Sequence, residues 1–130
     1  MASRPLKGPF PAITNGSMSG NLTSVVTIIQ NLSMLSYGVS WSGTSPVGTL
    51  SVQVSNDYTQ NQEGSVSNPG TWTTLVLNVS GVPSSTVPVS GSPGTAFIDV
   101  TQTSAYAMRL VYTAASGSGT LQATGDCKVQ

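Results

Sequence analysis

Residues 37–55 read Y-G-V-S-W-S-G-T-S-P-V-G-T-L-S-V-Q-V-S. Large apolar side chains alternate with small or polar ones on both sides of residues 43–47, with Tyr37, Val39 and Trp41 before this segment and Leu50, Val52 and Val54 after it. A period of two residues is typical of a β-strand with one buried face, because successive side chains point to opposite faces. The stretch therefore predicts two strands, 34–42 and 49–55, joined as a hairpin by a turn at residues 43–47.

The same chemistry extends through the whole chain of 130 residues. Ser, Thr and Val are abundant, and the 14 Gly and 8 Pro residues recur between apolar runs, as turn residues do between strands. Strands are expected at residues 22–30, 34–42, 49–55, 71–80, 95–100, 105–113 and 120–125. We expect an all-β, single-domain antiparallel β-sandwich of jelly-roll type, with immunoglobulin-like connections as the alternative. The proline-rich segment 81–94 is expected at a sheet edge or across one end of the sandwich.

Residues 1–19 carry prolines, glycines and a few scattered apolar side chains. This pattern predicts an extended N-terminal arm, residues 1–19, followed by a β-sandwich domain, residues 20–130. Such an arm either stays loose or gains order by lying on a neighbouring subunit, because it has too few apolar side chains to pack alone. Deletion of residues 1–19 is expected to leave the sandwich folded but to abolish assembly. The arm residues offered for interaction are Arg4, Leu6, Lys7, Phe10 and Ile13.

One internal correspondence appears at an offset of 71 residues. Val39, Trp41, Gly48, Thr49, Leu50 and Val52 align with Leu110, Tyr112, Gly119, Thr120, Leu121 and Ala123. Read as structure, the correspondence predicts two similar hairpins. Chance similarity in a chain rich in Gly, Ser and Thr is the alternative interpretation.

Charge and residue content exclude several classes of function. Lys and Arg number four, Asp and Glu number four, His is absent, and Cys127 is the single cysteine. Ser-His-Asp and Cys-His catalysis, imidazole metal sites, disulfides within the chain and zinc-finger spacings are therefore excluded. Four cations are also too few for the row of phosphate contacts that nucleic-acid binding requires. We expect a non-enzymatic protein without cofactor or metal, with no nucleic-acid partner.

Hydropathy predicts no association with a membrane. No run of about 18 apolar residues occurs, and no apolar stretch of signal-peptide length follows the N-terminus. We therefore expect synthesis in a cytoplasm.

The charged residues most open to a functional interpretation are Asp57, Glu63 and Arg109. Asp57 and Glu63 share the polar loop 56–70, but their spacing does not match a calcium-binding loop, so we expect an ordinary solvated loop. Arg109 lies inside an expected strand. We expect its guanidinium to cover a sheet face or to pair with Asp99 on an adjacent strand.

Aromatic residues could form a platform for sugar rings. Trp41 and Trp72 sit in regular alternation and are expected in the core. Tyr58, in the polar loop, is the aromatic residue expected to be exposed, and it is the candidate contact for a glycan.

Two strings resemble a known protein family. They are Y-G-V-S-W-S-G-T-S-P-V-G-T-L-S-V-Q-V-S-N-D, residues 37–57, and A-Y-A-M-R-L-V-Y-T-A-A-S-G-S-G-T-L-Q-A, residues 105–123. They resemble small β-sandwich proteins encoded in the structural gene clusters of tailed bacteriophages. In that family a W-x-G-x-x-x-x-G-T-L-x-V-x-x-S-N-D hairpin precedes a tryptophan strand, and an A-Y-x-x-R-L-x-Y-T hairpin ends in S-G-x-G-T-L.

The resemblance covers about residues 20–125, and its motifs are turn and core positions, so it transfers no functional residue. It implies a virion structural protein: a head decoration or cement protein, a minor capsid protein or a tail-associated subunit. The implied partners are copies of the chain itself and other virion proteins such as the major capsid protein, after synthesis in the cytoplasm of a bacterial host. The loops 56–70 and 81–94 are longer than the family pattern, and the ending Gly-Asp-Cys-Lys also departs from it. A receptor- or carbohydrate-binding module is the alternative function.

Overall fold

The computed structural model describes residues 7–29, 34–79, 81–101 and 105–128. Within these ranges the chain forms antiparallel β-structure throughout, which confirms the predicted all-β class. The described residues contain no helix of the length and hydropathy that crossing a membrane requires.

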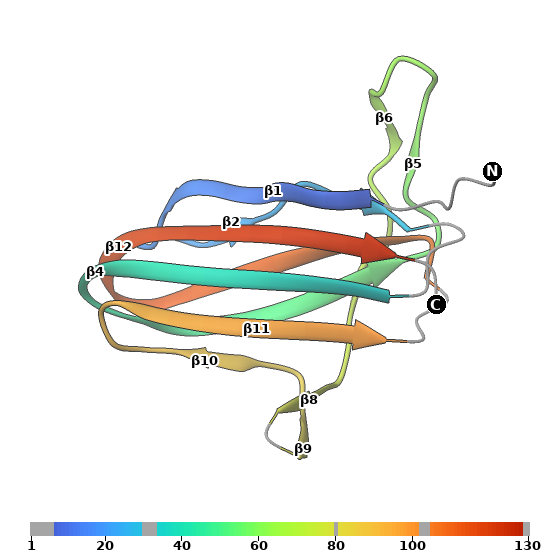
Figure 1. Ribbon diagram of the computed structural model, residues 1–130. Coiled ribbons are helices and arrows are strands. Elements are labelled where there is room, and N and C mark those ends of the chain that lie inside the picture. The colour runs from blue at the N-terminus through green and yellow to red at the C-terminus, as the bar shows by residue number, and fades with distance from the viewer. Residues whose placement is uncertain (1–6, 30–33, 80, 102–104, 129–130) are drawn as a thin grey trace.

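Two strands of 22 residues form the centre of the molecule, β4 (Met34–Ser55) and β12 (Ala107–Lys128). They pair with each other antiparallel from Ala107 opposite Ser55 to Lys128 opposite Met34. Each strand runs along one layer of the sandwich, bends at one end of the molecule and returns in the other layer (Figure 1). The predicted hairpin at residues 43–47 is therefore wrong, because the chain crosses between layers there without pairing with itself.

Close contact between the two backbones explains the bend. Gly117 has a φ of +80°, and a Cβ on it would lie 2.1 Å from the carbonyl oxygen of Ser45. A Cβ on Gly43 would lie 2.3 Å from the Cα of Gly119. Glycine permits both the positive φ and the close approach, so the two strands remain paired through the bend.

The internal correspondence is an approximate two-fold relation between β4 and β12. Trp41 pairs with Leu121, and Leu50 pairs with Tyr112. Trp41 corresponds to Tyr112 at the offset of 71 residues, and Leu50 corresponds to Leu121. The first pair therefore becomes the second when the two strands are exchanged. The similar sequences therefore belong to two bent strands paired with each other, and the expectation of two separate hairpins is wrong.

Pairing around β4 and β12 produces two layers. The first layer has the order β1 (Lys7–Ser17), second half of β12, first half of β4, β11 (Gly94–Thr101). The second layer places β2 (Leu22–Thr23) and β3 (Thr27–Ile28) beside the first half of β12, followed by the second half of β4 and then by β7 (Thr73–Thr74) and β10 (Val87–Val89).

The layers identify the connections. Each long strand contributes one segment to each layer, β2 and β3 together count as one segment, and β7 and β10 together count as one. Numbered in chain order, the described residues of the two layers then form eight segments. Their orders are 1-8-3-6 and 2-7-4-5, which is the arrangement of a jelly roll. This confirms the jelly-roll prediction over the immunoglobulin-like alternative. β10 is at an edge, as predicted for the proline-rich segment 81–94.

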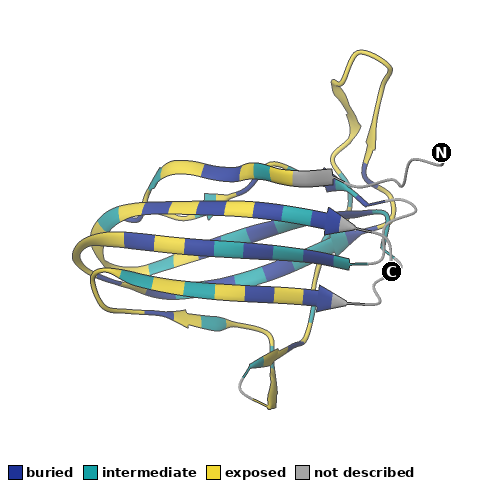
Figure 2. Cartoon of the chain, in the orientation of Figure 1, coloured by how far each residue is buried: buried dark blue, intermediate teal, exposed yellow. Residues whose placement is uncertain are grey.

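The core lies between the layers and is made of the alternating apolar residues. Burial alternates with exposure along β4, β11 and β12 (Figure 2). Trp41 is 5% exposed and belongs to the core as predicted, whereas Trp72 is half-buried and lies outside it. The largest fully buried side chains include Tyr37, Tyr112, Met18, Ile29, Leu35, Leu50, Met108, Leu110 and Leu121.

The expectation of an arm over residues 1–19 is wrong for residues 7–18. β1 pairs with β12, with Phe10 opposite Gly125 and Ile13 opposite Ala123, and Ile13 and Met18 are buried in the core. Pro9 and Pro11 are accommodated because β1 is an edge strand whose register shifts at both places. Residues 1–6, with Arg4 and Leu6, lie outside the described residues.

Two short ribbons complete the chain. β5 (Thr59–Gln60) and β6 (Val66–Asn68) form a hairpin that stands clear of both layers (Figure 1). β8 (Leu77–Val79) and β9 (Val82–Ser84) form a second ribbon near β10 and β11.

Candidate functional site

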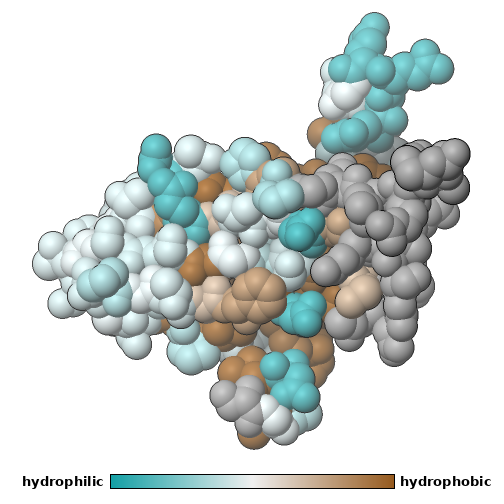
Figure 3. Space-filling model, viewed as in Figure 1, coloured by the Kyte–Doolittle hydropathy of each residue, from teal (hydrophilic) through white to brown (hydrophobic). Residues whose placement is uncertain are grey.

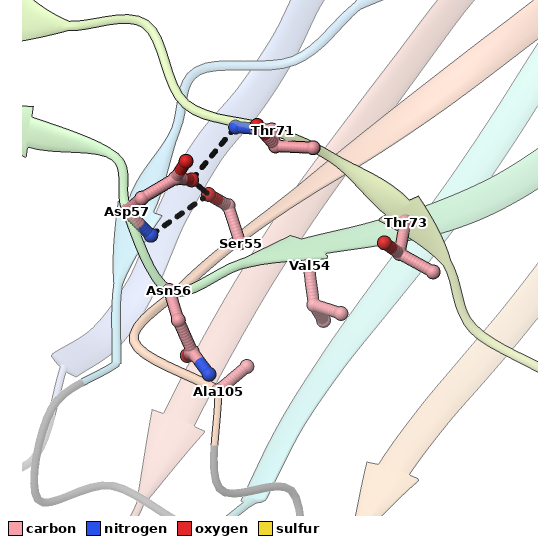
Figure 4. Close-up of a pocket in the computed structure, with 7 residues that line it drawn as sticks. All are labelled: Val54, Ser55, Asn56, Asp57, Thr71, Thr73 and Ala105. Carbon is pink, nitrogen blue, oxygen red and sulfur yellow. Dashed lines mark hydrogen bonds between the residues drawn. The ribbon is translucent and has the colours of Figure 1, made fainter.

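The base of the β5–β6 hairpin is closed by Asp57. Its Oδ1 accepts a hydrogen bond from the backbone nitrogen of Thr71 at 2.7 Å and another from Oγ of Ser55 at 2.8 Å (Figure 4). Oγ of Ser55 in turn accepts from the backbone nitrogens of Asp57 and Tyr58. The Thr71 amide, followed by the Ser55 hydroxyl, holds the pKa of Asp57 below its ordinary value of 3.8. The carboxylate therefore ties the two ends of the loop together.

A hollow opens beside this base (Figure 4). Three of its polar atoms bond to the chain itself: Oδ1 of Asn56 accepts from the backbone nitrogen of Tyr106 at 2.8 Å, and Oδ1 of Asp57 and Oγ of Ser55 are bonded as described. Its lining residues are Val54, Ser55, Asn56, Asp57, Thr71, Thr73 and Ala105. This arrangement stabilises the loop, since these polar groups bond to the chain itself.

Tyr58 is 4% exposed, so the expectation that it is the exposed aromatic residue is wrong. The returning end of the loop covers it: Gly70 has a φ of +83°, and a Cβ there would lie 3.0 Å from Cβ of Tyr58. The ring of Tyr58 packs against Trp72 with centroids 5.8 Å apart and planes inclined by 55°. Tyr58 was expected to be exposed and is buried, whereas Trp72 was expected in the core and lies half-buried outside it.

The guanidinium of Arg109 lies over the ring of Trp72. The guanidinium carbon lies 4.2 Å from the ring centroid, and Nε1 of Trp72 donates to the carbonyl of Pro69 at 2.8 Å. Nε of Arg109 donates to Oε1 of Gln53, its register partner on β4, also at 2.8 Å. Arg109 covers the outer face of the second layer as predicted, and partial burial lowers its pKa.

The predicted pairing of Arg109 with Asp99 is wrong. Asp99 lies on β11 opposite Ser36 in the first layer, whereas Arg109 lies in the second layer. Among the described residues, the guanidinium makes its side-chain hydrogen bond through Nε alone. Its two terminal nitrogens therefore retain donors for an acceptor from outside the chain.

The tip of the β5–β6 hairpin is held in a defined shape. Oδ1 of Asn61 accepts from the backbone nitrogens of Glu63 and Ser65, both at 2.9 Å, and Gly64 takes a φ of +90°. The backbone of Asn61 also exchanges hydrogen bonds with Gly64 and Ser65. Glu63 is exposed at this tip, in a hairpin that is mostly hydrophilic (Figure 3).

The outer face of the first layer is rich in small polar residues. Thr120 and Gln122 of β12 alternate with its buried residues, as do the serines of β4. Phe97 of β11 is 71% exposed on this layer. Phe10 is half-buried over Gly125, where a Cβ would lie 2.4 Å from its ring, and Lys7 begins β1.

Phe10, Ile13 and Tyr58, three of the sequence-predicted interaction residues, lie among the described residues, on different elements. Phe10 and Ile13 lie on β1 in the first layer, whereas Tyr58 lies at the base of a loop that follows the second layer. Gln53 and Trp72 both contact Arg109, and the sequence did not predict that these three residues come together. Strand alternation places Gln53 outward, but the approach of the loop to Arg109 is a tertiary contact without a sequence signal.

Comparison with known proteins identifies a fold. No family model matches the chain, and no curated protein sequence matches it significantly. The crystal structure of the SPBc2 prophage-derived protein YomS is similar, with a TM-score of 0.59 and 10% sequence identity. The similarity covers 97% of this chain and 96% of that one. The two proteins therefore share one architecture over almost their full lengths.

Proposed function

We propose that this chain is a non-enzymatic structural protein of a bacteriophage particle, and specifically a capsid decoration, cement or minor capsid protein. It binds copies of itself and neighbouring particle proteins and stabilises the particle through those contacts. The prophage origin of the structurally similar protein supports a phage role, as does the resemblance of residues 37–57 and 105–123 to phage β-sandwich proteins.

The observation that carries the proposal is the arrangement around Arg109. A guanidinium is positioned by Trp72 and Gln53 and keeps free donors, while a preshaped hairpin projects nearby. Arg and Trp are enriched where protein surfaces bind one another. Oδ1 of Asp57 and Oδ1 of Asn56 hold the base of the loop, which keeps the hairpin in position for docking to a protein surface.

Low surface charge is consistent with this role. Charged residues make up 6% of the chain, so electrostatic repulsion between copies is weak. The hydroxyl-rich outer face of the first layer, with exposed Phe97, offers a broad uncharged surface for a neighbouring subunit.

A tail-associated or carbohydrate-binding module is the second candidate. The observation in its favour is the half-buried Trp72 beside Arg109, whose terminal nitrogens keep donors for sugar hydroxyls. The burial of Tyr58 removes the residue expected to contact a glycan, so this function would depend on Trp72 instead.

The test uses phage particles made with and without this protein. We expect the particles without it to release their genome at a lower temperature, and purified protein added back to restore the release temperature. A particle reconstruction should show jelly-roll density on the capsid. Equal release temperatures together with density on the tail, or glycan binding that Trp72→Ala abolishes, would support the second candidate instead.

A further inference from the structure

We propose that two copies of this chain bind each other through the β5–β6 hairpin, with Glu63 of each copy pairing with Arg109 of the other. The inference rests on the proposed function and deepens it by naming the surface through which copies associate.

Arg109 is the residue that receives the incoming hairpin. The contact with Trp72 and the hydrogen bond to Gln53 hold its guanidinium in one orientation on the outer face of the second layer. The planar guanidinium binds a carboxylate with two parallel hydrogen bonds, and its terminal nitrogens retain the donors for them. A carboxylate is therefore the group that this site fits.

Glu63 is the carboxylate best placed to reach it. Asn61 fixes the turn that presents Glu63, and Glu63 is exposed at the end of a hairpin that stands clear of the sandwich (Figure 1). Asp57 is occupied in closing the loop. Asp99 and Asp126 lie on the first layer, away from Arg109.

The hairpin cannot supply this contact within one copy. Tyr58 stands at its base against Trp72, on which Arg109 lies, and Glu63 is five residues further along. Extended chain advances by about 3.3 Å per residue, so the three residues from Tyr58 to the start of the turn at Asn61 carry the tip about 10 Å from the base. Bringing Glu63 back to Arg109 of the same copy would break the pairing of β5 with β6. A second copy is the occupant that supplies a complementary charge.

A two-fold axis makes the contact reciprocal. Each hairpin then reaches over the partner's second layer, and both Glu63–Arg109 pairs form at once. Val66 is 53% exposed on the same hairpin, and Val111 and Trp72 are half-buried on the receiving face. These side chains supply apolar contact around each ion pair, which gives the charges a partly desolvated setting.

Charge exchange tests the pairing on the full chain. The molar mass in solution is measured by light scattering and sedimentation over a range of concentrations. We expect wild type to dimerise, and Glu63→Arg to weaken dimerisation by ~100-fold or more because like charges then meet. Arg109→Glu should do the same, and the double variant Glu63→Arg with Arg109→Glu should return to within ~10-fold of wild type. Asp126→Lys reverses a charge on the first layer and is the matched control. Its molar mass in solution should be that of the wild-type dimer.

Loss of dimerisation can be distinguished from misfolding of a variant. Arg109→Glu also disturbs Trp72, but Glu63 is an exposed residue at a hairpin tip. Glu63→Arg should therefore retain the wild-type circular dichroism and, at concentrations where both proteins are monomeric, the wild-type melting temperature. A monomeric wild type at high concentration, dimerisation unaffected by Glu63→Arg, or no recovery in the double variant would each overturn the inference.

If monomeric Glu63→Arg still stabilises the particle, the proposed function stands and the dimer is not needed for it. If wild type dimerises but never binds the particle, the proposed function fails and the dimer stands.

Discussion

Arg109 and Trp72 come from two elements that are distant in the sequence, and they are in contact: the guanidinium carbon of a central strand lies 4.2 Å from the centroid of an indole ring in a loop. The contact fastens the loop that carries the β5–β6 hairpin to the second layer. Tyr58 extends the stack inward, with its ring 5.8 Å from that of Trp72. The hairpin therefore projects from a rigid base.

The stack should contribute measurably to stability. We expect a double-mutant cycle of Trp72→Leu and Arg109→Met to give a coupling free energy of about 0.5–1 kcal/mol, the usual range for a cation–π contact at an exposed site. Urea unfolding followed by tryptophan fluorescence and circular dichroism measures it. Arg109→Met combined with Val66→Ala is the control, and those two effects should add. A coupling of zero in the first cycle would show that the contact does not stabilise the fold.

Loop closure by Asp57 should depend on pH. Its folded-state pKa is below the ordinary value of 3.8, so the stability it contributes is present above that value and is lost as pH falls through the folded pKa. Amide exchange at Thr71 should therefore accelerate as the pH falls below that ordinary value, relative to exchange in β4. In Asp57→Asn, Thr71 should exchange faster at neutral pH and lose this acid dependence. An unchanged Thr71 amide in the variant would contradict the assignment.

The bend in the two long strands should depend on glycine at position 117. Gly117→Ala places a Cβ 2.1 Å from the carbonyl oxygen of Ser45 at a φ of +80°, so we expect the free energy of unfolding to fall by about 2 kcal/mol or more. Gly38→Ala is the control, because a Cβ there meets no atom within 4 Å, and it should be neutral or slightly stabilising. Equal stability of the two variants, measured by urea unfolding, would refute the role of Gly117.

Removal of β1 should unfold the protein. β1 and the residue after it supply Ile13 and Met18 to the core and pair with β12, so deletion of residues 1–19 should abolish the cooperative thermal transition. Met18→Ala alone should cost about 2–5 kcal/mol, the usual range for a fully buried methionine. Deletion of residues 1–6 keeps β1 and serves as the control. A folded protein after deletion of residues 1–19 would restore the interpretation of that segment as an arm.

The amino-acid sequence alone determined the class of the fold and most of its core. The alternation of Tyr37, Val39 and Trp41 with small residues predicted a half-buried strand, and the structure confirms it. Proline lacks a backbone donor, so the residue pattern of segment 81–94 was enough to place it at an edge. These features depend on local chemistry, so sequence was sufficient for them.

Tertiary structure decided what the local pattern could not. A short segment with Gly43 and Pro46 between two alternating runs reads equally as a turn or as a bend. The choice at residues 43–47 depends on the approach of Gly117 and Gly119 from β12. β1 reads as an arm because its few apolar residues are buried only once β12 lies beside them. The burial of Tyr58 and the outward position of Trp72 follow from the folding back of a loop, and no spacing along the chain encodes that contact. Local residue pattern determined the strands, whereas long-range backbone contact decided how they are joined and which aromatic residue faces outward.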